Sequence, residues 1–185
     1  MNQPPINSNE QPVPPEQPRM VQVRLPGNVK TPGVTYAIIG VTVFVYILQL
    51  ISQSLYGQNV DLPFILGGKI NSLIQQGQVW RLITPLLLHG SILHIGFNMY
   101  ALFSIGPSLE RAYGHGRYLL LYLLSGFAGN TLSFLLSPAA SIGASTAIFG
   151  LVIAEVVFIY RNRQMFGGRA RNMLLNLGLI IVVNL

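Results

Sequence analysis

The chain has 185 residues, of which 51% are apolar and only 9% are charged, and its formal net charge is +6. Soluble domains carry about 25% charged residues, so this composition excludes an ordinary water-soluble domain. The absence of cysteine also excludes disulfides, thiolate metal sites and a cysteine nucleophile.

Residues 1–33 form a polar segment that contains eight prolines and many Gln and Asn residues. Such a segment cannot bury enough apolar surface to fold by itself, so we predict a disordered Pro/Gln-rich tail. It has no early apolar stretch, which argues against a cleaved signal peptide.

Residues 34–185 contain long apolar runs with few charged side chains, and we predict that they form one transmembrane domain. Runs of about 20 apolar residues can cross the roughly 30 Å hydrocarbon core of a bilayer as helices. The predicted fold class is therefore an all-α polytopic membrane protein. Its expected spanning helices are residues 34–55, 91–109, 118–136 and 145–160, and a fifth that begins at 172.

The connection between the first two expected helices, residues 56–90, is too long for a loop without structure of its own. It contains Gly67, Gly68, Pro63 and Pro85 as well as a moderately apolar stretch. We therefore predict short helices that lie in the outer membrane interface.

Lysine and arginine are distributed unevenly between the two predicted sides of the membrane. Cytoplasmic segments carry the excess of positive charge. We therefore predict a protein of the cell membrane whose N-terminus lies on the cytoplasmic side and whose residues 56–90 and 137–143 lie on the outer side. The positive charge thus indicates topology rather than a nucleic-acid partner. With this orientation, two basic residues, Lys69 and Arg81, lie outside, and nine lie inside: Arg19, Arg24, Lys30, Arg111, Arg117, Arg161, Arg163, Arg169 and Arg171.

A small-residue motif, residues 143–150, opens the fourth expected helix at its outer end and contains Ser145. A helix N-terminus offers unpaired N–H groups and a positive dipole end, so a serine there can attack a carbonyl while N–H groups face the oxyanion. The alternative is a packing role, because Thr146, Gly150 and Ala154 recur every fourth residue and would let another helix approach closely.

Two polar side chains, His94 and Asn98, lie four residues apart near the outer end of the second expected helix, and therefore on one face. Both can donate hydrogen bonds to an oxyanion. Interhelical hydrogen bonding without chemistry is the alternative. The topology places both side chains at the same membrane depth as Ser145, which favours an acyl-transfer site.

These residues occur with three further motifs in an order and spacing that resemble the rhomboid intramembrane proteases. The resemblance extends over about residues 34–185. The segments that carry it are Gly143–Ser145, His94–Asn98, Trp80-Arg81, Leu88–Ser91 and Gly106–Arg111.

The resemblance implies a role for each candidate residue. Ser145 would be the nucleophile, and His94 and Asn98 would form the oxyanion hole with backbone N–H groups near the serine. Phe149 would pack beneath the catalytic histidine. Other motif residues would be structural: Glu110 and Arg111 would bond within the inner turn, and Trp80-Arg81 would anchor the outer loop.

The sequence departs from the family pattern in two ways. Thr146 replaces the usual second glycine of the Gly-x-Ser-Gly motif. Members of the family also place the general-base histidine on a sixth helix, and no histidine of this chain is placed to act as the base. We therefore expect five of six spanning helices here and a catalytic histidine beyond residue 185. We also expect the 185 residues alone to be inactive, with the small-residue stripe lacking its partner, the sixth helix.

The resemblance implies an intramembrane serine endopeptidase that cleaves single-pass membrane proteins within the lipid bilayer, with no metal or cofactor. One alternative is a catalytically inactive relative that binds membrane helices. Another is a small transporter or channel, for which Glu155 is the only acid within an expected span. The residues do not indicate the oligomeric state.

Overall fold

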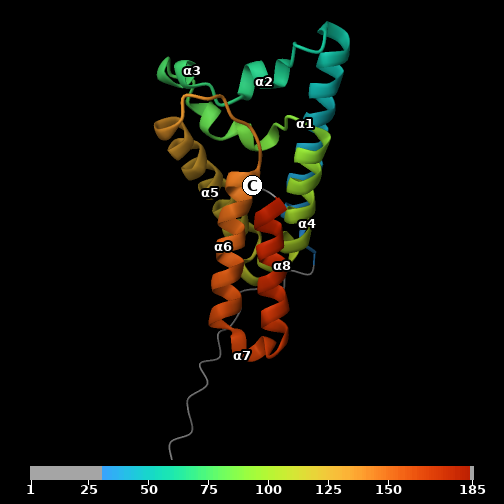
Figure 1. Ribbon diagram of the computed structural model, residues 1–185, viewed down its shortest axis with the longest axis vertical. Helices are drawn as coiled ribbons and strands as arrows, with labels where there is room; N and C mark the ends of the chain where they lie inside the picture. The colour runs from blue at the N-terminus through green and yellow to red at the C-terminus, as the bar shows by residue number, and fades with distance from the viewer. Residues whose placement is uncertain (1–30, 184–185) are drawn as a thin grey trace, which may run out of the picture.

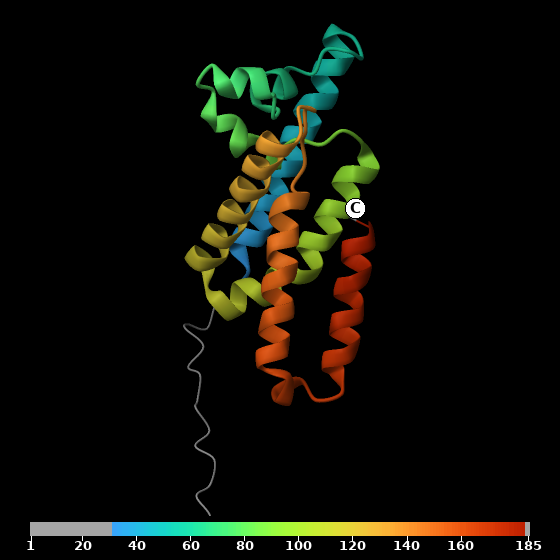
Figure 2. The same cartoon turned by 60° about the vertical axis from the view of Figure 1, so that its left-hand side comes forward.

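The structure is a computed structural model that describes residues 31–183. Most of the predicted disordered tail, residues 1–33, therefore lies outside the described residues. The five longest helices of the described residues form a bundle, and Figures 1 and 2 show them running alongside one another. They are α1 (Gly33–Tyr56), α4 (Ile92–Tyr113), α5 (His115–Leu136), α6 (Ser145–Arg161) and α8 (Arg169–Val183).

Three of these helices, α1, α4 and α5, have 24, 22 and 22 residues and are long and apolar enough to cross a membrane. This agrees with the first three predicted spans. The other two, α6 and the described part of α8, have 17 and 15 residues and pack alongside them. A buried apolar core, which includes Leu102, Leu109, Ile148 and Leu151, lies between the helices.

The long connection of residues 56–90 folds into short helices, as predicted, at one end of the bundle (Figure 1). Another short helix, α7 (Arg163–Phe166), lies at the opposite end, between α6 and α8. The four helices of the connection are α2 (Leu62–Gly67), α3 (Asn71–Gln75) and the 3-10 helices η1 (Val79–Leu82) and η2 (Thr84–Leu87).

The predicted extent of the inner turns was wrong. α4 continues to Tyr113 and α5 begins at His115, so the single residue Gly114, with φ of 83°, separates them. The charged residues Arg111 and Arg117 suggested a loop, but a long arginine can belong to a helix end while its guanidinium reaches the interface. For the same reason α8 begins at Arg169, inside the predicted basic loop.

Glu110, near the C-terminal end of α4, joins this helix to the N-terminal ends of α1 and α5. Its carboxylate is fully buried and accepts hydrogen bonds from the N–H groups of Val34 (2.9 Å) and Thr35 (2.8 Å) and from the Thr35 hydroxyl (2.6 Å). It also contacts the imidazole of His115. A carboxylate at a helix N-terminus satisfies free N–H groups and complements the helix dipole, so Glu110 caps α1. This agrees with the predicted structural role of Glu110, although its bonds reach beyond the inner turn.

Lys69 binds backbone carbonyl groups at the C-terminal end of α5. Its ammonium is fully buried and donates to the carbonyls of Ser133 (3.1 Å), Ser137 (2.8 Å) and Ala139 (2.9 Å). Its backbone pairs with Ser141 in an isolated antiparallel bridge. The outer loop is therefore fastened to the segment that leads into α6.

Arg81 stabilises the outer loop itself. It is 3% exposed, and its guanidinium donates to the carbonyls of Gly68 and Ile65, each at 2.7 Å, at the C-terminal end of α2. The adjacent Trp80 is half-exposed and donates its indole N–H to the Leu66 carbonyl at 3.2 Å. The pair thus anchors the loop through the free carbonyls of α2.

The small-residue stripe of α6 packs against α5, and the prediction that its close partner is a sixth helix was wrong. A Cβ on Gly150 would lie 2.0 Å from the Ser125 hydroxyl oxygen, and a Cβ on Gly129 would lie 2.5 Å from Thr146 Cβ. Small residues on both helices therefore permit this close approach. The sequence showed the stripe on α6 but not which neighbour would face it.

Candidate functional site

Ser145 is the first residue of α6 and is partly exposed. The N-cap residue, Ala144, has no side-chain acceptor for the N–H groups of the first helical turn, which therefore lack the usual capping partner. The preceding Gly143 donates its N–H to the Pro85 carbonyl at 2.9 Å, which holds the entry to α6 against the outer loop. The helix end thus presents a serine beside free backbone donors.

The imidazole of His94 lies against Gly143, next to Ser145. A Cβ built on Gly143 would lie 2.6 Å from His94 Nε2 and 3.8 Å from Ser145 Oγ. Gly143 also has φ of 123°, a conformation that other residues rarely adopt. Glycine is therefore required here for two reasons, and its missing side chain leaves room for the His94 imidazole near Ser145.

His94 is oriented by the residues that surround the start of α4. Ser91 caps this helix by accepting a hydrogen bond from the His94 N–H at 3.1 Å. The ring of His89 packs edge-on against the His94 ring, with centroids 4.9 Å apart and an interplanar angle of 67°. The buried Gln49 of α1 accepts a hydrogen bond from the His89 backbone N–H at 3.0 Å. α1, α4 and the outer loop together set the position of the imidazole.

The pKa of His89 is lowered to about 4. Burial disfavours the charged imidazolium, the neighbouring His94 adds to the effect, and an approach to the Leu87 backbone offsets only part of it. Neither ring nitrogen of His89 has a hydrogen-bond partner of normal geometry among the described residues. His89 is therefore a neutral packing group at pH 7 and a weak base.

Asn98 lies one turn below His94 on the same helix and is 1% exposed. Its side-chain Nδ2 donates to the His94 carbonyl at 2.8 Å, while Oδ1 is buried and has no hydrogen-bond partner among residues 31–183. The structure thus brings His94 to the serine and leaves the Asn98 amide bonded to its own helix. His115, the third histidine, is distant from Ser145 in the sequence and contacts Glu110 at the cap of α1.

Sequence reasoning identified Ser145, His94 and Asn98 but missed two residues that support them. Gly143 was noted only as part of the serine motif, although its contact with His94 joins the two halves of the site. Gln49 was missed altogether. A signal was available, because Gln49 is an amide within a predominantly apolar span, and such polar residues usually face the protein interior.

The fold and the comparisons with known proteins agree on the class of protein. Long apolar helices around a buried core define an all-α polytopic membrane protein. A family model described as "Rhomboid domain" matches residues 76–185. The chain therefore belongs to the rhomboid family.

The relatives that the chain resembles include several proteins named as proteases. It is 42% identical over 154 residues to Rhomboid protease GluP of Bacillus subtilis (strain 168), which covers 83% of this chain and 29% of that protein. It is 37% identical over 138 residues to Rhomboid-like protease 3 of Toxoplasma gondii, a match that covers 70% of this chain and 52% of that protein. It is 39% identical over 106 residues to RHOMBOID-like protein 9, chloroplastic, of Arabidopsis thaliana, a match that covers 57% of this chain and 24% of that protein. The chain thus spans between a quarter and about half of the length of these relatives.

Proposed function

We propose that this chain supplies the nucleophile and oxyanion-binding groups of an intramembrane serine endopeptidase that cleaves single-pass membrane proteins in or beside their transmembrane segments. The observation that carries the proposal is the position of the His94 imidazole, which lies against Gly143 beside Ser145 at the N-terminus of α6. Two relatives that resemble the chain are named as proteases.

In this proposal Ser145 Oγ attacks the carbonyl carbon of the scissile peptide bond. The developing oxyanion receives hydrogen bonds from N–H groups at the start of α6 and from His94 Nε2, in the tautomer that carries a proton there. Asn98 joins them when its amide turns away from the His94 carbonyl. Collapse of the intermediate expels the amine, and water then hydrolyses the acyl-enzyme.

A serine hydroxyl requires a base that accepts its proton and later delivers it to the leaving amine. His94 is assigned to the oxyanion, and the lowered pKa of His89 makes it a weak base. We propose that the base is a histidine of a sixth helix, outside the 185 residues. The alternative function, an inactive relative that binds membrane helices, requires no base.

The test is the reaction of the full-length protein with a fluorophosphonate probe, together with cleavage of a model single-pass substrate. Labelling should disappear in Ser145→Ala, and Asn98→Ala should lower turnover by roughly 10²-fold, as expected for one oxyanion donor. Gly143→Ala should also impair both reactions, because its Cβ would displace His94. Gly90→Ala is the matched control, since its Cβ would meet nothing closer than Ile142 Cδ1 at 3.7 Å.

Three outcomes would reject parts of this proposal. Labelling that persists in Ser145→Ala would reject the nucleophile. Substrate binding without cleavage or labelling would favour the inactive relative. Robust labelling of residues 1–185 expressed alone would make His89 the base and reject a sixth-helix histidine.

A further inference from the structure

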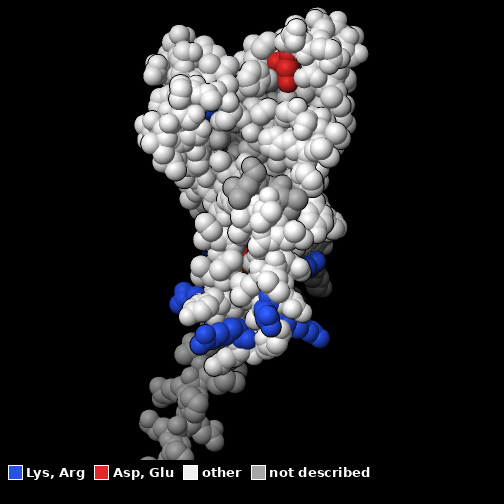
Figure 3. All heavy atoms as spheres, viewed as in Figure 1, with Lys and Arg blue, Asp and Glu red and all other residues white. Residues whose placement is uncertain are grey.

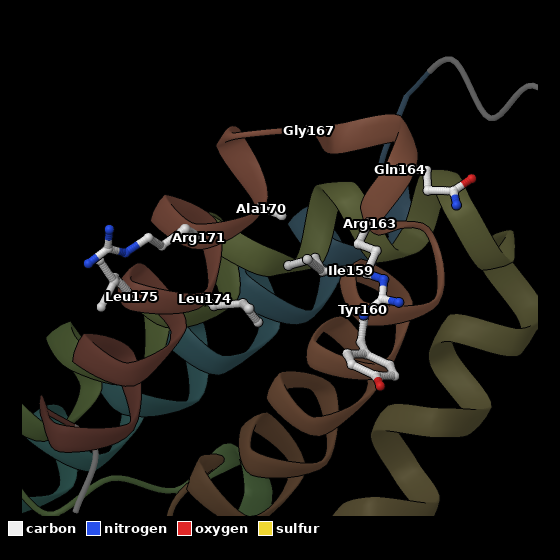
Figure 4. Close-up of a pocket in the computed structure, with 9 residues that line it drawn as sticks. All are labelled: Ile159, Tyr160, Arg163, Gln164, Gly167, Ala170, Arg171, Leu174 and Leu175. Atoms are coloured by element: carbon white, nitrogen blue, oxygen red, sulfur yellow. The ribbon is translucent and has the colours of Figure 1, made fainter.

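A pocket of about 610 Å³ opens between the end of α6, α7 and the start of α8, at the end of the bundle opposite the candidate active site. Figure 4 shows Ile159 and Leu174 facing each other across it, with Ala170 at its top. Arg163 and Arg171 also line it, on opposite sides. Its walls are thus apolar and its edge is cationic.

The charges around this pocket have no counterpart within the described residues. Lys and Arg gather at this end of the molecule in Figure 3. Neither Arg163 nor Arg171 forms an ion pair there, since the one pair of the described residues joins His115 to Glu110. The only acid in residues 145–183 is Glu155, which is 4% exposed and bonded to the Ser108 hydroxyl. The pocket therefore attracts an anion.

One of the two guanidinium groups is already held in place. Arg163 lies over the ring of Tyr160, 5.3 Å from its centroid, which limits the conformational freedom that binding would have to remove. A guanidinium presents planar, paired N–H donors that match a phosphate group. Arg171 is exposed and can approach the same ligand from α8.

We propose that this pocket binds an anionic phospholipid of the membrane leaflet at this face. The apolar helix α6 ends at Arg161 here and α8 begins at Arg169. Basic residues at the ends of membrane helices reach the interface, so the pocket would lie at the depth of lipid headgroups. A phospholipid matches both parts of the lining: its phosphate meets Arg163 and Arg171, and its acyl chains lie along Leu174 and Leu175. A soluble anion would use the arginines alone and leave the apolar walls uncovered.

The experiment uses the full-length protein in bilayers of phosphatidylcholine with increasing phosphatidylglycerol. Tyr160→Trp places a fluorescent ring beside the pocket, and Trp80, the only tryptophan among the 185 residues, lies in the loop of residues 56–90 at the other end as an internal reference. Quenching by brominated phosphatidylglycerol and brominated phosphatidylcholine reports which lipid occupies the pocket. The residue-160 signal should prefer phosphatidylglycerol by roughly fivefold for each arginine engaged, which corresponds to about 1 kcal/mol per basic residue near an anionic surface.

Arg163→Gln/Arg171→Gln should abolish this preference, whereas Arg111→Gln/Arg117→Gln removes the same charge from the same end of the bundle and should retain it. Arg163→Lys/Arg171→Lys tests the point independently of folding, because it keeps both charges and should retain a reduced preference. Equal quenching by the two lipids, or an equal loss in the two Gln pairs, would overturn the proposal. Displacement of the lipid by millimolar glycerol phosphate would also overturn it in favour of a soluble anion.

Discussion

His89 is a titratable side chain held in a buried position beside the candidate active site. It is 2% exposed, and its pKa is lowered to about 4, against an ordinary value of about 6.5. Between these values the unfolded chain binds a proton at residue 89 that the folded protein does not bind. Stability therefore falls as the pH falls from about 6.5 to 4.

We predict that replacing His89 with phenylalanine removes most of this pH dependence. A shift of this size corresponds to at most about 3 kcal/mol, and phenylalanine sacrifices no ring hydrogen bond because neither imidazole nitrogen has a normal partner. The measurement is the melting temperature of the purified protein in detergent at pH 7, 6, 5 and 4. An unchanged pH slope in His89→Phe would show that other groups cause the acid lability.

At this scale the candidate side chains could be selected from the sequence more readily than their surroundings. Ser145 and His94 could be found because a polar residue at one membrane depth is conspicuous in an apolar chain. The contact that joins them passes through Gly143, where the informative feature is a missing side chain and a positive φ. The glycine itself can be read from the sequence, but its contact with His94 cannot, because that contact depends on the approach of a distant helix.

The close approach of α5 and α6 leads to a prediction at the scale of elements. Gly150→Ala would place a Cβ 2.0 Å from Ser125 Oγ, so the helices must separate, at about 1–3 kcal/mol of stability. Ser125→Gly in the same chain should restore much of the loss by removing the opposing atoms. Thermal unfolding of the single and double variants measures this effect.

Gly96→Ala is the control for that series, since a Cβ there would meet nothing within 4 Å. If Gly150→Ala and Gly96→Ala unfold at the same temperature, or if Ser125→Gly fails to compensate, the packing of the stripe against α5 is not the cause. Such variants should leave the orientation of the chain in the membrane unchanged.

Helix ends were less predictable than helix centres for a physical reason. α1 and α6 begin and end within one residue of the predicted limits, because apolar runs end there abruptly. α4 and α5 extend further because Glu110 is buried in a cap and Arg117 can point outward from a helix. The pairings of Lys69 and Arg81 with free carbonyls could not be predicted, because their partners are set by the packing of distant segments.

The distribution of charge over the whole molecule favours one orientation in the membrane. Both basic residues of the loop of residues 56–90, Lys69 and Arg81, are buried and donate hydrogen bonds to backbone carbonyls. At the opposite end six arginines are exposed, from which the positive-inside rule predicts that this end faces the cytoplasm. The six are Arg111, Arg117, Arg161, Arg163, Arg169 and Arg171.

Cysteine labelling can test this orientation directly, because the chain contains no native cysteine. Gln76 and Gln164 are exposed side chains at opposite ends of the molecule. In intact cells an impermeant maleimide should react with Gln76→Cys and not with Gln164→Cys, whereas both should react after lysis. Labelling of Gln164→Cys in intact cells would reverse the proposed topology and place Ser145 on the cytoplasmic side.

The Glu110 cap has a consequence for the order of events during synthesis of the chain. The residues it joins, Thr35 and Glu110, are 75 positions apart. At about 5–20 residues per second, the ribosome adds the carboxylate roughly 4 to 15 seconds after the first turn of α1. During that interval the N–H groups of Val34 and Thr35 cannot donate hydrogen bonds to the Glu110 carboxylate, so they must donate to water or lipid headgroups instead. The N-terminal end of α1 can therefore dock against Glu110 only after α4 has been translated.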